Sequence, residues 1–208
     1  MLNRGYTVKS ALEIVSSRYL LSRVERNILY RCVHPKNINE EVRRKTRKEL
    51  SGELLLIDFY NVTTTIGEAI EGYEVYRCTD GFIRDVASMH GRSRKDEACL
   101  LRSITTMLKI IKHAPPSEII LVVDKQISYS KVIAAKAVEK LRSLCKSYFI
   151  LSPKSDVELV RLSKELGGIV SSSDIVVLIK SPTVTDLAGI SILEEFPDRV
   201  VELWVHAL

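Results

Sequence analysis

The sequence predicts an α/β protein with an open, mostly parallel sheet that carries helices on both faces and follows a small basic helical domain. Five short apolar runs predict buried strands, and segments with helical periodicity separate most of them. Strands that alternate with helices of this length are typical of βαβ units, whose right-handed crossovers place helices on both faces of a sheet. Charge is the third observation, because the basic residues are concentrated near the amino terminus.

Each expected strand is a run of consecutive apolar residues, as in strands that are buried on both faces. The runs are 54–57, 119–123, 148–151, 175–179 and 200–205. Helical patterns are expected at about residues 95–113, 129–146, 155–167 and 184–195. Residues 66–94 give the weakest pattern, and we expect a helix or a hairpin with loops there.

The amino-terminal quarter is read as a separate basic domain. Apolar residues at helical spacing in 7–33 predict one or two amphipathic helices, and 40–50 reads as a basic helix. We place the domain boundary at Gly52, which gives a helical domain over 1–52 and an α/β domain over 53–208. Residues 1–52 hold 12 basic and 5 acidic residues, a net charge of +7, whereas the rest of the chain has a net charge of −2.

This charge distribution suits a polyanionic partner such as nucleic acid, whose phosphates a cationic segment neutralises. We expect the strongest basic run to follow the phosphate backbone; it consists of Arg43, Arg44, Lys45, Arg47 and Lys48. A second basic cluster, Arg92, Arg94 and Lys95, would also grip a nucleic-acid backbone. In both places the alternative is an ordinary solvated charged surface.

Several classes of protein are excluded or disfavoured. A chain of 208 residues buries enough surface to need no disulfide or structural metal, and its four scattered cysteines indicate reduced thiols in a cytoplasmic protein. No apolar run approaches the ~20 residues of a membrane helix, and no secretory signal is evident. The glycine spacing matches neither a dinucleotide-binding loop nor a P-loop.

Acidic residues follow the apolar runs, at the edge of a parallel sheet where ligands bind. They are Asp58, Asp124, Asp156 and Asp174. Asp156 alone is read as a helix N-cap, Asp124 could terminate a strand in a turn, and Asp174 could cap a serine-rich loop. Asp58 is harder to explain structurally, because it closes an apolar run and no helix-start pattern follows it.

Carboxylates that gather at one edge repel one another, and a divalent cation is the simplest counter-charge. Oxygen ligands without nearby histidine or cysteine predict Mg²⁺ or Mn²⁺. A site of this kind polarises a phosphodiester and activates water for in-line hydrolysis. Lys125, which follows Asp124, could stabilise the negative charge of a transition-state phosphate.

These residues resemble the PIN-like nucleases, close to their NYN branch, and an uncharacterised archaeal PIN-like domain that follows a small helical domain of unknown function. The resemblance rests on Asp58 with Asn61, on the strand-ending Asp124, and on the segment from Asp156 to Asp174. It implies that Asp58, Asp156 and Asp174 hold the metal, with Asp124 as a fourth acid and Asn61 and Ser173 in support. The sequence departs from the family pattern in two ways. The acid that many PIN domains carry on a central helix has no secure match here, and the insertion around 66–94 is not typical of a minimal PIN domain.

The leading hypothesis is therefore a divalent-metal-dependent phosphodiester hydrolase, with RNA as the substrate that the resemblance implies. A homodimer that shares the acidic edge is compatible with this reading. The alternative is a nucleic-acid-binding adaptor on a catalytically inactive nuclease-like fold. A haloacid-dehalogenase-like phosphatase is disfavoured, because that chemistry needs a second aspartate at position 60, which is a tyrosine.

Overall fold

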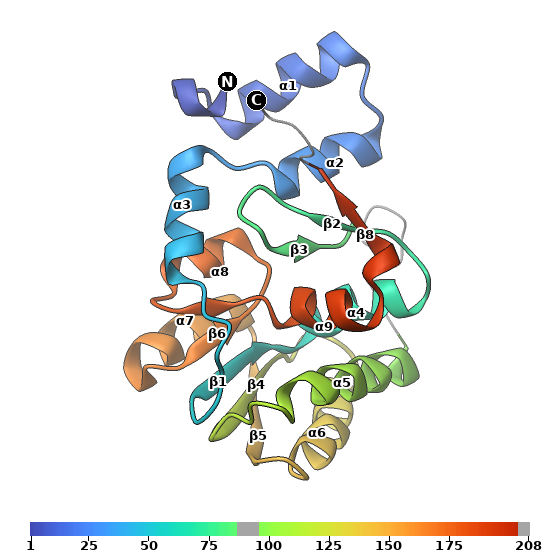
Figure 1. Cartoon of the computed structure of the whole chain (residues 1–208), viewed down its shortest axis with the longest axis vertical. Coiled ribbons are helices and arrows are strands. Elements are labelled where there is room, and N and C mark those ends of the chain that lie inside the picture. The colour runs from blue at the N-terminus through green and yellow to red at the C-terminus, as the bar shows by residue number, and fades with distance from the viewer. Residues whose placement is uncertain (87–95, 204–208) are drawn as a thin grey trace.

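A five-stranded parallel sheet forms the centre of the protein in the computed structural model, which describes residues 1–86 and 96–203 (Figure 1). The strand order is β5-β4-β1-β6-β7. The strands are β1 (Leu54–Asp58), β4 (Glu118–Asp124), β5 (Lys146–Ser152), β6 (Ile169–Ser171) and β7 (Val184–Thr185). The predicted α/β class and parallel sheet are confirmed.

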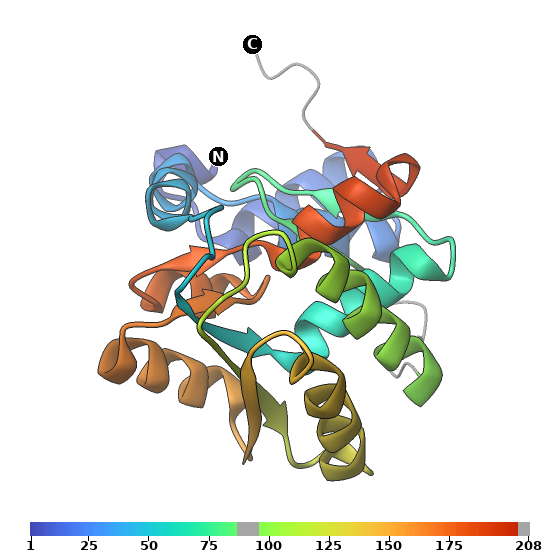
Figure 2. The same ribbon diagram turned by 60° about the horizontal axis from the view of Figure 1, so that its bottom comes forward.

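Helices cover both faces of this sheet, as Figure 2 shows, because alternate side chains of each strand point to opposite faces and both sets are apolar. One face, which includes Leu55 and Ile57, packs on α4 (Phe59–Ile70), α5 (Glu97–Ile111), α6 (Ser130–Leu141) and α9 (Leu187–Glu195). The other face, which includes Leu56, packs on α3 (Lys36–Lys45), α7 (Ser155–Leu166) and α8 (Ile175–Lys180).

A second, three-stranded sheet lies between the central sheet and the first two helices (Figure 1). It contains β2 (Val75–Arg77), β3 (Ile83–Arg84) and β8 (Val200–Glu202), with β2 antiparallel to β3 and parallel to β8. The helices above it are α1 (Val8–Tyr19) and α2 (Arg23–Cys32), and two short 3-10 turns cover Leu2–Arg4 and Pro197–Arg199. None of the helices in the described ranges is both long and apolar enough to cross a membrane.

The amino-terminal segment packs directly on the α/β core. Val42 of α3 is fully buried in the same apolar cluster as Leu56 and Val184, and the backbone N–H of Arg47 donates to the Val184 carbonyl at 2.8 Å. The helices begin and end at conventional signals, such as the Ser22–Glu25 capping box of α2 and Gly167, whose positive φ of 75° ends α7. Cys32, Cys78 and Cys99 are buried thiols, and Cys145 is a half-buried one.

Three predictions of secondary structure are wrong. Residues 175–179 form helix α8 and not a strand, because Asp174 caps the segment and β7 takes the position beside β6. The run from Val200 forms β8 of the small sheet, whereas the fifth central strand is the two-residue β7, within the segment expected to be helical. A helix does follow Asp58 at once, since Phe59, Val62 and Ile66 bury one face of α4.

Candidate active site

The crevice at the carboxyl end of β1 and β6 is where the chain reverses its direction across the sheet. From β1 the chain adds β4 and β5 on one side, and it then returns to place β6 and β7 on the other. Connections that leave neighbouring strands in opposite directions open a crevice, and ligands of open α/β sheets bind there. Asp58 ends β1 at this point, and the Ser172–Asp174 loop follows β6.

Asp58 faces the side of the sheet that α7 and α8 cover, because it alternates with Leu56 along β1. It is only 9% exposed, and its Oδ2 accepts a hydrogen bond of 3.0 Å from the Ser172 hydroxyl. Asn61, in the first turn of α4, accepts through Oδ1 from the Ser173 backbone N–H at 2.7 Å and from its hydroxyl at 3.0 Å. The structure therefore brings Asp58, Asn61 and Ser173 together.

The electrostatics of this crevice are unfavourable for an ionised Asp58. Burial, followed by the negative charges of Asp174 and Asp156, raises the pKa of Asp58 to about 7. The Ser172 hydroxyl and the Asn61 backbone amide oppose this rise without cancelling it. The carboxylates of Asp174 and Asp156 are thus close enough to Asp58 for their charges to oppose its ionisation.

Asp174 and Asp156 reach the crevice from the amino-terminal ends of two helices. Asp174 is the N-cap of α8, and its Oδ1 accepts from the backbone N–H groups of Val176 at 2.7 Å and Val177 at 3.2 Å. Asp156 is exposed and is the second residue of α7, whose N-cap is Lys154. The reading of Asp156 as an N-cap is therefore wrong, and its carboxylate lies in the first helical turn.

Asp124 lies farther out along the same edge. Asp58 pairs with Val122, so Asp124 extends two residues beyond it, or about 7 Å along the strand. Its Oδ1 accepts from the Gln126 backbone N–H at 2.8 Å, which is the turn that the alternative reading gave. The exposed Lys125 follows Asp124 in this outer turn.

The acids of this crevice are hard oxygen donors, the kind of ligand that Mg²⁺ and Mn²⁺ prefer. In the described part of the chain, no three side chains of histidine, cysteine, aspartate or glutamate are grouped closely enough to hold a metal ion. Mg²⁺, however, is commonly held by one or two carboxylates together with water and substrate phosphates. Asp58 with Asp174 or Asp156 supplies such hard oxygen ligands, and their mutual repulsion favours a cation.

The basic residues expected to bind nucleic acid divide into two groups. Arg43 donates to the Thr79 carbonyl, and Lys45 contacts Glu41 and the Ile179 carbonyl, so both have structural roles. Arg43, Arg44, Arg47 and Lys48 are all exposed, whereas Lys45 is half-buried. The predicted contacts of Arg92, Arg94 and Lys95 lie outside the described residues.

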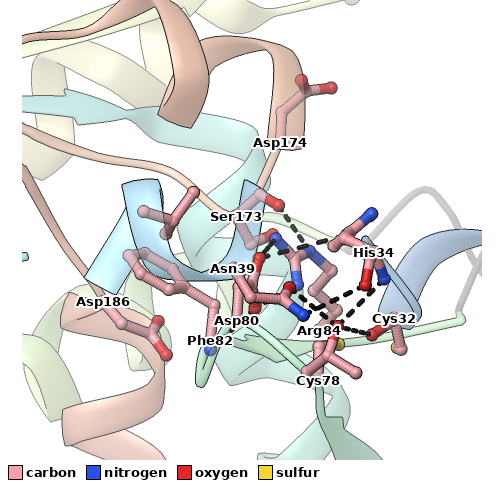
Figure 3. Close-up of polar contacts among 12 residues, drawn as sticks. Cys32, His34, Asn39, Cys78, Asp80, Phe82, Arg84, Ser173, Asp174 and Asp186 are labelled. Carbon is pink, nitrogen blue, oxygen red and sulfur yellow. Dashed lines mark hydrogen bonds and ion pairs between the residues drawn. The ribbon is translucent and has the colours of Figure 1, made fainter. Parts of the chain in front are cut away.

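An ion pair that the sequence did not reveal holds the loop beside the crevice (Figure 3). Arg84, 2% exposed, donates from Nη1 and Nη2 to the two carboxylate oxygens of Asp80 at 2.9 and 2.6 Å. Its Nε donates to the Ser173 carbonyl at 2.6 Å. Asp80 and Arg84 come from the hairpin in the weakly patterned stretch 66–94, where only their i,i+4 spacing could have suggested an ion pair.

The same cluster connects the amino-terminal helices to the crevice. The hydroxyl of Thr79 donates to Asn39 Oδ1 at 2.9 Å, and the Asn39 amide donates to the His34 carbonyl at 3.0 Å. His34 lies beside Asp80 and Arg84, and burial together with the Arg84 charge lowers the pKa of its imidazole. The segment after α2 is therefore fixed against the residues that position the Ser173 loop.

Fold and site together define a parallel α/β protein with carboxylates at its topological switch point. A domain of unknown function, DUF5616, matches residues 47–190, and a protein of unknown function, DUF434, matches residues 1–45. Uncharacterized protein MJ0935 of Methanocaldococcus jannaschii is 30% identical over 187 residues, which cover 88% of this chain and 86% of that protein. No solved structure matches the chain. The chain belongs to the DUF5616 family and carries a DUF434 segment before it.

Proposed function

We propose that this protein is a divalent-metal-dependent phosphodiester hydrolase of the PIN-like type that cleaves RNA. The observation that carries the proposal is the buried Asp58, which ends the central strand within range of two further carboxylates at the switch point. A buried acid whose ionisation is opposed by neighbouring acids is costly to a fold and is characteristic of functional sites. RNA is preferred to DNA because of the resemblance to PIN-like nucleases.

The roles of the residues follow from their positions. Asp58, with Asp174 and Asp156, would hold Mg²⁺ or Mn²⁺, which when bound polarises the phosphodiester and activates the attacking water. The Ser172 hydroxyl orients the Asp58 carboxylate, and Asn61 fixes the backbone of Ser173 beside it. Arg84 donates to the backbone carbonyl of Ser173 and so limits movement of the loop that carries Asp174.

Substrate would be brought to the crevice by the basic amino-terminal segment. Arg44, Arg47 and Lys48 are exposed, and the guanidinium of Arg47 makes only long hydrogen bonds of 3.5 Å, to the carbonyls of Arg44 and Thr46 in its own segment. Phosphate contacts of this kind supply affinity that depends on salt and not on base sequence. Asp124 and Lys125 lie farther out along the same edge of the sheet, where the exposed ammonium group of Lys125 would contact a phosphate of the substrate.

The proposal is tested by cleavage of an end-labelled single-stranded RNA in the presence of Mn²⁺. Asp58→Asn removes the charge and keeps the shape of the side chain, and we expect it to lower the cleavage rate by at least about a hundredfold. Asp198→Asn is the matched control, because Asp198 is exposed in the 3-10 turn at Pro197–Arg199. Cleavage by Asp58→Asn at the wild-type rate and matched metal concentration would refute the proposal.

A nucleic-acid-binding adaptor is the second candidate, because the described residues contain no complete three-ligand metal group and Asp174 already caps a helix. A manganese titration followed by thermal unfolding separates the two functions. The hydrolase is stabilised by Mn²⁺ through Asp58, whereas the adaptor binds RNA without metal and shows no stabilisation that Asp58→Asn removes.

A further inference from the structure

A cleft of about 450 Å³ lies next to the candidate active site, between the first two helices and the start of α8. One wall is a single face of α2 and of the segment that follows it, with residues at i, i+3, i+4 and i+7: Asn27, Tyr30, Arg31 and His34. Arg84 and Ser173 lie opposite, together with Asp174. Asp174 therefore belongs both to this cleft and to the group of carboxylates.

The charges of the cleft do not favour a phosphate inside it. Both oxygens of Asp80 bind the Arg84 guanidinium, and Arg31 lies 3.5 Å from the Asp85 carboxylate. Each arginine thus already has an acidic partner, and Asp174 adds a further negative charge. Apolar side chains line the rest of the cleft, namely Val8, Ile175 and Val176. The lining suits an uncharged, flat group with a polar edge.

Polar groups that such a ligand would need are available. The side chain of His34 is 7% exposed, and its Nε2 has no hydrogen-bond partner among the described residues, although Asp80 Oδ2 lies 4.0 Å away. A buried polar atom without a hydrogen bond is costly, and a ligand atom would relieve that cost. Tyr30 lines the cleft and is 60% exposed, so its ring is accessible to a stacking partner.

We propose that this cleft receives one unpaired base of the RNA substrate, stacked on Tyr30 with its polar edge toward Asn27 and His34. The volume lies within the range of small-molecule sites, and unpaired RNA bases are commonly held by aromatic stacking and edge hydrogen bonds. The inference rests on the proposed hydrolysis of RNA and deepens it. With the base in the cleft, the attached phosphate lies outside it, on the side of Asp174.

The test is a binding measurement in EDTA, so that no cleavage occurs. A short single-stranded RNA that contains 2-aminopurine loses fluorescence when that base stacks on an aromatic ring, and titration gives the affinity. We expect Tyr30→Ala to weaken binding by roughly tenfold and to abolish the quenching, whereas Tyr30→Phe retains both. Tyr19→Ala is the matched control, because Tyr19 is exposed at the end of α1 and does not line the cleft.

A second probe separates the base from the phosphates. An oligonucleotide with abasic sites keeps every phosphate and lacks the bases. We expect its affinity for the wild-type protein to be as low as the affinity of normal RNA for Tyr30→Ala. Equal affinity for the abasic and normal RNA, or wild-type quenching by Tyr30→Ala, would overturn the inference. This assay measures no cleavage, so it tests the base site separately from hydrolysis. If Asp58→Asn loses RNA cleavage but still binds the RNA base through Tyr30, the result supports both the hydrolase and the base-binding cleft. If the wild-type protein binds RNA without metal and cleaves none, only the hydrolase proposal is refuted.

Discussion

Replacement of Asp58 by asparagine is expected to stabilise the metal-free protein at alkaline pH. The folded-state pKa of Asp58 is about 7, against 3.8 for a free aspartate, so the folded protein holds a proton that the unfolded chain loses between these values. The stability associated with the protonated carboxyl is therefore present below about pH 4 and is lost as the pH rises through 7. The difference corresponds to an upper limit of about 4 kcal/mol, at 1.36 kcal/mol per pKa unit.

Asparagine removes this penalty because it stays neutral at every pH and still accepts a hydrogen bond from Ser172. We expect the free energy of unfolding of Asp58→Asn to be about 2 to 4 kcal/mol higher than that of the wild type at pH 8 in EDTA, and equal to it near pH 4. Urea denaturation at both pH values measures the difference, with Asp198→Asn as the control. Equal stability of wild type and Asp58→Asn at pH 8 would refute the reasoning, and added Mn²⁺ should narrow the gap.

Three further substitutions test other parts of the site. Asp174→Ser keeps a helix N-cap and removes a carboxylate, so RNA cleavage should fall sharply while the thermal midpoint changes by only a few degrees; normal cleavage would exclude Asp174 as a metal ligand. Arg84→Met leaves Asp80 buried without its partner and should cost about 3–5 kcal/mol in urea denaturation, and a loss below 1 kcal/mol would contradict the pair's importance. Asp186 is the N-cap of α9, and its carboxylate accepts from the backbone N–H groups of Gly189 and Ile83, both at 2.8 Å. Gly189→Ala places a Cβ 2.0 Å from Asp186 Oδ2 and should cost about 1–3 kcal/mol, so an unchanged thermal midpoint would show that the carboxyl moves freely.

Secondary structure was predictable where the periodicity was long and was not where a short segment depends on its neighbours. The pattern of residues 155–167 predicts a helix, and α7 is one. The apolar run 175–179 has the composition of a buried strand, yet it forms a helix because Asp174 caps it and Val177 and Leu178 pack against the sheet. Local composition does not determine which segment takes the sheet position beside β6.

The candidate site was predictable in part. Asp58, Asp156 and Asp174 converge because carboxyl ends of parallel strands meet at one edge, which follows from the order of strands and helices in the sequence. The role of Arg84 was not predictable, because it depends on a hairpin that brings its guanidinium between Asp80 and the carbonyl of Ser173. The cleft beside Tyr30 was not predicted either, since its two walls are far apart in the chain.

The sequence by itself determined the parallel α/β class, the basic amino-terminal segment and the presence of an acid after each of several strands. These features follow from hydrophobic periodicity and residue type, which act over a few residues. The tertiary structure decided which acids meet. Strand register sets Asp124 about 7 Å beyond Asp58, and burial of Asp58 raises the pKa of its carboxyl to about 7. Register and burial depend on packing among distant segments, and only the folded chain fixes them.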